Sequence, residues 1–393
     1  MTTESRKPVK KKKPVRPDAE RQASSTGKKK KVPASAKKNS KKKRTKILLF
    51  IVEIFVLLLM VVVLYGVLKT EKVGKVEIPE EDIVINPIVE QKEETTMKGY
   101  RNIALFGVDS TTGALDKNTR SDSIMIASIN LDTGECKLVS VYRDTYLNLS
   151  NDSYNKCNAA YAKGGPKQAI NMLNMNLDMN ITDFVTVGFE GLADTIDALG
   201  GVEIDVAENE ISHLNNYQIS MVGKTSDGKT YTANAGTDYI PVTTAGRQVL
   251  NGLQATAYCR IRYVGDDFQR TQRQRTVLLA IAEKAKKASP ATLNKIANDV
   301  FDEIYTSLDL SEIVELLGEV SKYEVVGQGG FPEESMRATG TIGSKGSCVV
   351  PKSLADNVTW LHQFLFDDNN YTPSAEVQSY SEKIAADAGS YVN

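Results

Sequence analysis

The sequence predicts an α/β protein, specifically an α/β/α sandwich around a mixed central sheet. Beyond Tyr100, short apolar runs with strand-like alternation are interleaved with runs that have helical spacing. This part of the chain also shows no internal repeat and no strong linker. We therefore expect one principal domain, residues 100–367.

The N-terminal part has two segments of opposite character. Residues 1–46 carry 19 Lys and Arg against 3 Asp and Glu, with almost no large apolar residue, so a disordered tail is expected. Residues 47–68 are apolar except for Glu53, and 22 residues of helix span roughly 33 Å, enough for one transmembrane helix. A cleaved signal peptide is the alternative, but the apolar run is long and no small-x-small site follows closely.

The charge distribution predicts a topology for these segments. The basic flank lies on the N-terminal side of residues 47–68, so the tail is expected in the cytoplasm and the rest outside the cell membrane. The tail is expected to contact anionic membrane lipids, and no nucleic acid is expected as a partner. Residues 69–99 are acidic and predict an extracellular tether, and residues 368–393 predict a flexible C-terminal tail.

Periodicity and turn residues predict the elements of the main domain. A hairpin is expected around Asp132-Thr133-Gly134, which is a turn sequence. Residues 207–245 are predicted to be a long excursion with a surface residue, His213, and Trp360 is expected on a C-terminal amphipathic helix. The expected strands are 102–108, 123–129, 136–142, 202–206 and 256–263, and the expected helices are 167–177, 189–199 and 268–287.

The four cysteines do not have the spacing of a metal site. Cys136, Cys157, Cys259 and Cys348 form no CxxC or Cys/His pattern. Cys136 and Cys259 fall in expected strands, where a free thiol behaves as a small apolar side chain. We expect free buried thiols, with a disulfide as the alternative outside the membrane.

Arginines are concentrated in one short stretch. Half of the ten arginines that follow Leu68 lie between Arg260 and Arg275, in a region otherwise richer in acidic residues. On a strand 256–263, alternation would put Arg260 and Arg262 on one face. A helix capped by Asp267 would then present Arg270, Arg273 and Gln274 at i, i+3 and i+4. This pattern favours binding of an anion such as a diphosphate, and surface ion pairing is the alternative.

The predicted hairpin brings a second charged cluster together. Pairing around Thr133 would place Arg120 and Asp122 near Arg143 and Asp144, and Asp109 ends its own strand. Two aspartates beside several arginines suit Mg²⁺, or Mn²⁺, bridging phosphate oxygens. Structural ion pairs are the alternative.

A methionine stripe suggests a third feature. Met172, Met175 and Met179 fall at i, i+3 and i+7 on an expected helix. Such a stripe is usual for core packing, but beside an anion site it also suggests a place for a lipid chain.

The ordered motifs resemble the LytR-CpsA-Psr family of Gram-positive cell-envelope ligases, which are anchored in the membrane. The matching runs are NIALFGVDS, RSDSIMIASINLDTG, SVYRDTY, KCNAAYAKGG, DALGGVEIDV and YCRIRYVGDDFQRTQRQR. The resemblance implies transfer of an anionic glycopolymer, such as teichoic acid or capsule, from a polyprenyl-diphosphate carrier to a peptidoglycan hydroxyl. Leu or Ile is frequent in the family where Cys157 stands here.

Roles follow from the resemblance, residue by residue. Asp109 and Asp122 would hold the magnesium, and the catalytic residues would be Arg120, Arg143, Asp267 and Arg270. The doubled Asp266-Asp267 leaves the assignment of that carboxylate open, and the general base is unassigned between Asp109 and Asp267. In the transferase interpretation, the diphosphate would be bound by Arg120, Arg143, Arg260, Arg262, Arg270 and Gln274.

Two alternative functions remain. One is a regulatory module that binds lipid diphosphates, and the other is a polyprenyl-diphosphate-saccharide hydrolase.

Overall fold

The computed structural model describes residues 74–93, 96–109, 115–116, 118–223, 232–289, 291–293, 296 and 303–389. They all belong to one compact unit, residues 63–393. The expected basic tail and membrane helix, residues 1–46 and 47–68, lie outside the described residues. Among the helices that are described, none combines the length and apolar character needed to cross a membrane.

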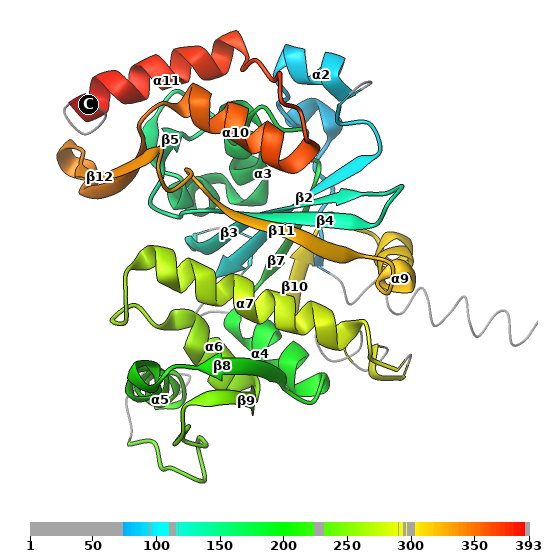
Figure 1. Ribbon diagram of the computed structural model, residues 1–393, viewed down its shortest axis with the longest axis vertical. Coiled ribbons are helices and arrows are strands. Elements are labelled where there is room, and N and C mark those ends of the chain that lie inside the picture. Colours follow the sequence, from blue (N-terminus) through cyan, green and yellow to red (C-terminus); the bar gives the residue numbers. More distant parts are fainter. Residues whose placement is uncertain are drawn as a thin grey trace, which may run out of the picture. The chain divides into compact units, whose positions relative to one another are not determined.

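A mixed seven-stranded sheet runs through the described part of the chain (Figure 1). Strands β2, β7, β4 and β11 all run in one direction, because β2 is parallel to β7, β4 is parallel to β11, and β3 lies antiparallel between β2 and β4. Their carboxyl ends therefore share one edge of the sheet. The strand order is β1 (Gly74–Lys75), β10 (Ile304–Thr306), β7 (Asp183–Val187), β2 (Tyr100–Val108), β3 (Ser121–Asn130), β4 (Glu135–Val141) and β11 (Glu324–Phe331).

Helices cover one face of the sheet and form the larger core. Ala104, Phe106 and Val108 alternate along β2 and point into this core. Figure 1 shows α3, α10 and α11 together on this side. The helices are α2 (Pro87–Glu93), α3 (Asn158–Leu177), α10 (Leu354–Phe366) and α11 (Ala375–Ala388).

A second group of elements lies on the opposite face and has its own core. Ile196, Leu214 and Val277 belong to this smaller cluster. The predicted α/β/α sandwich with a mixed sheet is thus confirmed for the described domain. The elements are α4 (Phe189–Ala198), β8 (Val202–Val206), α5 (Glu208–Val222), β9 (Gly246–Leu250), α6 (Gly252–Arg260) and α7 (Asp267–Ala285).

Short elements complete the domain. Strands β5 and β6 form one small hairpin, and β12 and β13 form another. These elements are η1 (Glu80–Asp82), β5 (Tyr146–Asn148), β6 (Tyr154–Lys156), α9 (Leu310–Glu319), β12 (Arg337–Thr341), η3 (Gly343–Lys345) and β13 (Ser347–Pro351).

The predicted strand 256–263 is wrong, because residues 252–260 form helix α6. The helix begins with a capping box in which Asn251 and Gln254 each accept the other's backbone N–H at 2.9 Å. Arg260 consequently ends a helix, and Arg262 follows in the loop. Arg260 and Arg262 therefore line the same pocket from the end of a helix and from a loop, and not from one face of a strand.

The structure also corrects the predicted tether, residues 69–99, and the predicted flexible tail, residues 368–393, because parts of both pack into the domain. In the expected tether, β1 pairs with β10 and Val89 of α2 is fully buried. In the expected flexible tail, α11 buries Val377 and Ile384. Apolar contacts with the larger core account for the order of both segments.

One carboxylate also links these two segments. Asp178 accepts hydrogen bonds from Asn86 Nδ2 at 2.6 Å and from the backbone N–H of Ser374 at 2.8 Å.

The segment 207–245, which was expected to be a long excursion, contains helix α5. Glu210 caps the first turn of this helix by accepting a hydrogen bond from the Ala207 N–H at 2.9 Å.

Candidate active site

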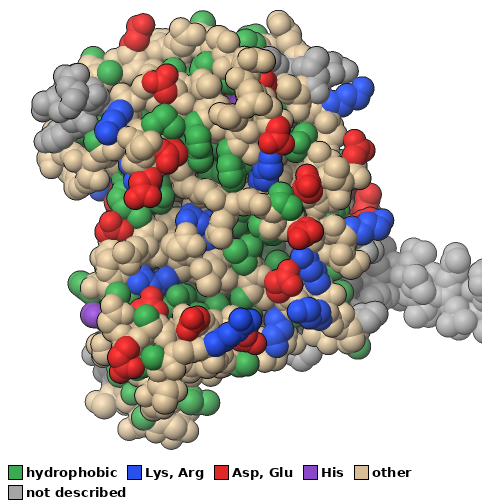
Figure 2. Space-filling view, in the orientation of Figure 1, with side chains coloured by type: hydrophobic (Ala, Val, Ile, Leu, Met, Phe, Trp, Pro, Cys, Tyr) green, Lys and Arg blue, Asp and Glu red, His purple; other side chains and the backbone are tan. Residues whose placement is uncertain are grey.

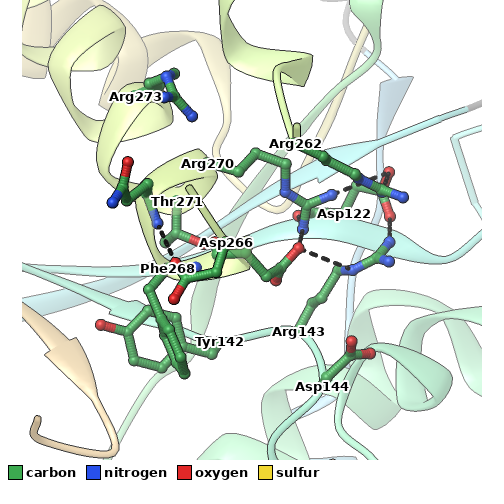
Figure 3. A network of polar contacts seen from close by, with 12 residues as sticks. Asp122, Tyr142, Arg143, Asp144, Arg262, Asp266, Phe268, Arg270, Thr271 and Arg273 are labelled. Carbon is green, nitrogen blue, oxygen red and sulfur yellow. Dashed lines mark hydrogen bonds and ion pairs between the residues drawn. The ribbon is translucent and has the colours of Figure 1, made fainter. Parts of the chain in front are cut away.

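The candidate site lies where the carboxyl ends of β2 and β4 meet the start of α7. Asp109 follows β2, Arg143 lies two residues beyond β4, and Asp122 is the second residue of β3. The hairpin register pairs Met125 with Ser140, which brings Asp122 beside Arg143 as the turn sequence predicts. Figure 3 shows Asp122 and Arg143 converging with Arg262 and Arg270.

Asp122 is surrounded by three guanidinium groups. Arg143 Nη1 donates a hydrogen bond to Asp122 Oδ1. Asp122 Oδ2 lies 3.6 Å from Arg262 Nη2 and 4.0 Å from Arg270 Nη1. The Asp122 carboxylate is therefore shared among three cations, and only Arg143 forms a hydrogen bond with it.

Asp267 connects two of the same arginines. Its Oδ1 atom lies 2.8 Å from Arg270 Nη2 and 3.8 Å from Arg143 Nε. The predicted N-cap role of Asp267 is wrong, because Asp266 accepts from the backbone N–H groups of Phe268 and Gln269 at 3.0 and 3.1 Å. The two adjacent aspartates therefore have different roles: Asp266 caps α7, and Asp267 orients Arg270 and Arg143.

Burial and like charge act together on Arg270. Its side chain is only 2% exposed. Burial lowers the pKa of Arg270, and Arg143 and Arg262 lower it further against the opposing effect of Asp267. Burial also lowers the pKa of Arg143, but Asp122, Asp144 and Asp267 outweigh it, so that pKa is raised. A bound anion would stabilise the charged form of both side chains.

Several buried polar atoms in the cluster have no hydrogen-bond partner among the described residues. They are Arg143 Nε, Arg270 Nε, Gln274 Oε1 and Asp267 Oδ2. Buried donors and acceptors without partners cost about 1–3 kcal/mol each, so the two guanidinium N–H groups are suited to a ligand's oxygens.

A polar pocket of about 160 Å³ opens onto the cluster. Arg260 projects into it with its Nη2 3.7 Å from Asp109 Oδ2 and its guanidinium 4.5 Å from the Phe189 ring centre. Tyr217 and Cys259 complete the wall. The predicted site residues that line it are Asp109, Asp122, Arg260, Arg262, Arg270 and Gln274.

Three predicted site residues are absent from this lining: Arg143, Arg120 and Asp267, which contacts Arg270 and Arg143. Arg143 does not line the pocket itself but donates a hydrogen bond to Asp122, which does. Arg120 is exposed just before β3 and makes no ion pair with the residues described here. Arg273, which helical spacing placed beside Arg270, points elsewhere: it binds Glu210 Oε1 at 2.6 Å and the carbonyl oxygen of Val264 at 2.8 Å.

An apolar pocket of about 420 Å³ adjoins the polar one. It lies between the sheet and helices α4 and α7, with Val185, Leu192 and Ile281 in its lining. The sequence analysis missed this pocket, although Val277, Leu278 and Ile281 repeat at helical spacing beyond Gln274. The two pockets share Asp122, Phe189, Cys259 and Gln274.

The methionine stripe takes no part in this pocket. Met172 and Met179 are fully buried in the core on the other face of the sheet. Of the two interpretations, core packing is correct, and the apolar cavity is formed by α4 and α7 instead.

The aspartates fit a divalent cation. Asp109 and Asp122 line the same pocket, and Mg²⁺ usually takes one or two carboxylates together with phosphate oxygens and water. Within the described ranges, no group of three His, Cys, Asp or Glu side chains could hold a metal by itself. The donor set therefore suits a metal that shares its ligands with a phosphate.

On the face in Figure 2, acidic and basic side chains are largely interspersed, with apolar side chains between them.

The chain is similar in sequence to curated proteins. TagV of Bacillus subtilis (strain 168), named a polyisoprenyl-teichoic acid–peptidoglycan teichoic acid transferase, is 29% identical over 233 residues, which cover 58% of this chain and 53% of TagV. Biofilm regulatory protein A of Streptococcus mutans serotype c is 29% identical over 289 residues, covering 65% of this chain and 66% of that protein. The matched region thus spans little more than half of the TagV length.

Solved structures share the fold. The crystal structure of Bacillus subtilis TagV has a TM-score of 0.54 and 26% identity, covering 70% of this chain and 99% of that one. A structure of TagT bound to LIIa-WTA has a TM-score of 0.51 and 21% identity, covering 75% and 92%. The profile of the LytR_cpsA_psr family matches residues 66–350. The chain therefore belongs to the LytR-CpsA-Psr family.

Proposed function

We propose that the protein is a phosphotransferase that moves an anionic glycopolymer from a polyprenyl-diphosphate carrier to a hydroxyl of peptidoglycan. The observation that carries the proposal is the junction of an arginine-lined polar pocket with a larger apolar pocket through Asp122, Phe189, Cys259 and Gln274. A polyprenyl diphosphate has the same two parts, an apolar chain and a dianionic or more highly charged head. The printed name of the TagV relative supports the same class of reaction.

The arginines bind and stabilise the diphosphate. The hydroxyl oxygen forms a bond to the phosphorus next to the sugar, the bond from that phosphorus to the bridging oxygen breaks, and polyprenyl phosphate leaves with the electron pair. The Nε–H groups of Arg143 and Arg270 are buried without a hydrogen-bond partner among the described residues, and they would donate to the charge that develops. Arg260 and Arg262 hold the head in the polar pocket.

The aspartates have separate roles in this proposal. Asp267 fixes Arg270 and Arg143 through its Oδ1 atom. Asp109 is 41% exposed and lines the pocket, so it is better placed to accept the proton of the incoming hydroxyl. Mg²⁺, held by Asp109 and Asp122, would neutralise phosphate charge when bound.

The remaining expectations belong to the same proposal. The chain is placed in the cell membrane by residues 47–68, with its domain outside and its basic tail on anionic lipids of the inner leaflet. Support comes from the sequence alone: the apolar run and the position of the basic flank.

The test uses the full-length chain in detergent with a polyprenyl-diphosphate-linked saccharide, Mg²⁺ and peptidoglycan fragments, and follows products by mass spectrometry. A phosphodiester-linked adduct is expected, and it should vanish with Arg143→Ala and with a chelator. The matched control is Arg247→Ala, since Arg247 on β9 is 78% exposed and pairs with Glu203 on the neighbouring strand β8.

Other outcomes decide between the alternatives. Polyprenyl phosphate with free saccharide phosphate would identify a hydrolase. Lipid binding with no turnover under any condition would favour a regulatory binding module, which is also the kind of role in the name of biofilm regulatory protein A.

A further inference from the structure

We propose that Arg337 is a positioning residue, which sets the distance between Arg143 and Asp267 by clamping the aromatic neighbours of both. The inference rests on the proposed function for its activity readout. Arg337 lies at the start of β12, outside every motif on which the sequence analysis depended.

The guanidinium of Arg337 contacts two aromatic rings. Its Cζ atom lies 3.8 Å from the ring centre of Phe268 and 4.9 Å from that of Tyr142. Nη1 donates to Tyr142 Oη at 3.1 Å and to the carbonyl oxygen of Pro332 at 3.4 Å. The side chain is only 13% exposed, so the stack is largely shielded from water.

Chain connectivity transmits these contacts to the site. Tyr142 immediately precedes Arg143, and Phe268 immediately follows Asp267. The two rings meet edge to face, with centres 4.6 Å apart and planes at 85°. The end of β4, the start of α7 and the start of β12 are thereby joined at one point, as Figure 3 shows for Tyr142 and Phe268.

The start of α7 needs such an anchor. It follows a short loop through Gly265, which has a positive φ of 82°. Tyr142 is fixed on its other side by β11, where a Cβ on Gly330 would collide with its hydroxyl. Phe268 therefore contacts a ring that packs closely against β11, and Arg337 contacts both rings.

The planar shape of Arg337 matters more than its charge. Its nearest carboxylate, Glu334 Oε1, is 3.9 Å away on an 86% exposed side chain, so that pair contributes little. Arg337 is also absent from the lining of the polar pocket. Lysine would keep the charge and lose the flat face and the fork of donors.

A small displacement of α7 would affect catalysis more than binding. Asp267 and Arg270 would move together, away from Arg143, whereas Arg260 and Arg262 lie before α7. Misplacement of a catalytic group by about 1 Å can cost on the order of 100-fold in rate.

The first test compares Arg337→Met and Arg337→Lys with wild type in the transfer assay on the full-length chain. Each variant should lower kcat at least tenfold and leave KM for the lipid-linked saccharide within twofold. Phe268→Tyr should retain wild-type kcat and Phe268→Leu should not. The control Arg247→Lys should change neither kcat nor KM.

A wild-type kcat in Arg337→Met would overturn the proposal. A lower melting temperature with an unchanged kcat per folded molecule would overturn it as well.

The second test needs no turnover and separates this inference from the proposed function. Amide hydrogen exchange should accelerate at least tenfold in Arg337→Met for Arg270 N–H, which donates to Asp266 O at 3.1 Å, and stay unchanged in α11. If the wild-type protein shows no transfer, the proposed function fails, and the hydrogen-exchange result alone decides whether Arg337 positions the start of α7. Unchanged exchange at the start of α7 would refute the clamp in either case.

Discussion

Arg270 Nη2 lies 2.8 Å from Asp267 Oδ1, one turn earlier on α7, and this guanidinium is almost fully buried. Arg262 and Arg270 both lie near a second aspartate, Asp122, but Arg262 approaches it from a loop and is 43% exposed. The arginines of the pocket thus divide into one that also supports the helix start and one that is free to face a ligand.

Replacing Arg262 and Arg270 should separate binding from stability. Arg262→Ala should weaken binding of a short polyprenyl diphosphate at least tenfold, about 1.4 kcal/mol, with an unchanged free energy of unfolding. Arg270→Ala should weaken binding and also lower the free energy of unfolding by roughly 1.5–3 kcal/mol, because it removes the charged hydrogen bond between Arg270 and Asp267. Calorimetric titration and urea unfolding measure the two effects, and equal stability losses in both variants would contradict this division.

The apolar pocket should respond to a polar side chain in its wall. Ile281→Gln places an amide among the apolar residues of the cavity. We expect at least tenfold weaker binding of a long polyprenyl diphosphate and unchanged binding of inorganic diphosphate. The matched control is Leu131→Gln, since Leu131 is an exposed apolar residue at the far end of the β3–β4 hairpin. Equal loss for both ligands would show that the change acts on the fold and not on the chain-binding pocket.

Arg273 should behave as a structural residue. Its guanidinium joins buried Glu210 to the carbonyl oxygens of Ile261 and Val264, on either side of Arg262. Arg273→Met should lower the free energy of unfolding by roughly 3–5 kcal/mol, since it leaves a buried carboxylate unpaired. Adding Glu210→Gln should recover part of that loss. A double variant less stable than the single one would exclude the buried-charge explanation.

Alkaline pH should destabilise the protein through its buried thiols. Burial raises the pKa of Cys259 to about 12, and burial also raises the pKa of Cys157. Below the unfolded-state pKa, about 8.5, both states are protonated and these groups add no slope. From there up to about pH 12 only the unfolded state releases the proton, so the free energy of unfolding falls by up to about 1.4 kcal/mol per pH unit for each thiol. Urea unfolding between pH 7.5 and 10 measures this slope, which Cys157→Ala with Cys259→Ala should reduce.

The hairpin and the choice of arginines could be predicted because both depend on local sequence. The turn at Asp132-Thr133-Gly134 fixes the strand register, and the register alone brings Asp122 to Arg143. The concentration of arginines from Arg260 to Arg275 likewise reflects the site without any tertiary information, although Arg273 shows that spacing cannot tell a ligand-binding arginine from a supporting one.

Helix α6 and the apolar pocket could not be predicted in the same way. Residues 256–263 alternate and contain Tyr and Ile, which favours a strand, but the capping box at Asn251 and burial against α4 and α5 determine a helix. The pocket needs residues from β7, α4 and α7, far apart in sequence, so no single periodic segment shows it. Arg337 was missed for the same reason.

The position of Asp178 has a practical consequence for defining the domain. Because this carboxylate accepts hydrogen bonds from both Asn86 and Ser374, a fragment that begins at residue 100 or stops at residue 367 would leave it without one of its donors inside the protein. The sequence alone suggests both cuts, and both would remove part of the folding unit. The smallest independently folding piece should therefore start before Gly74 and include α11 through Ala388.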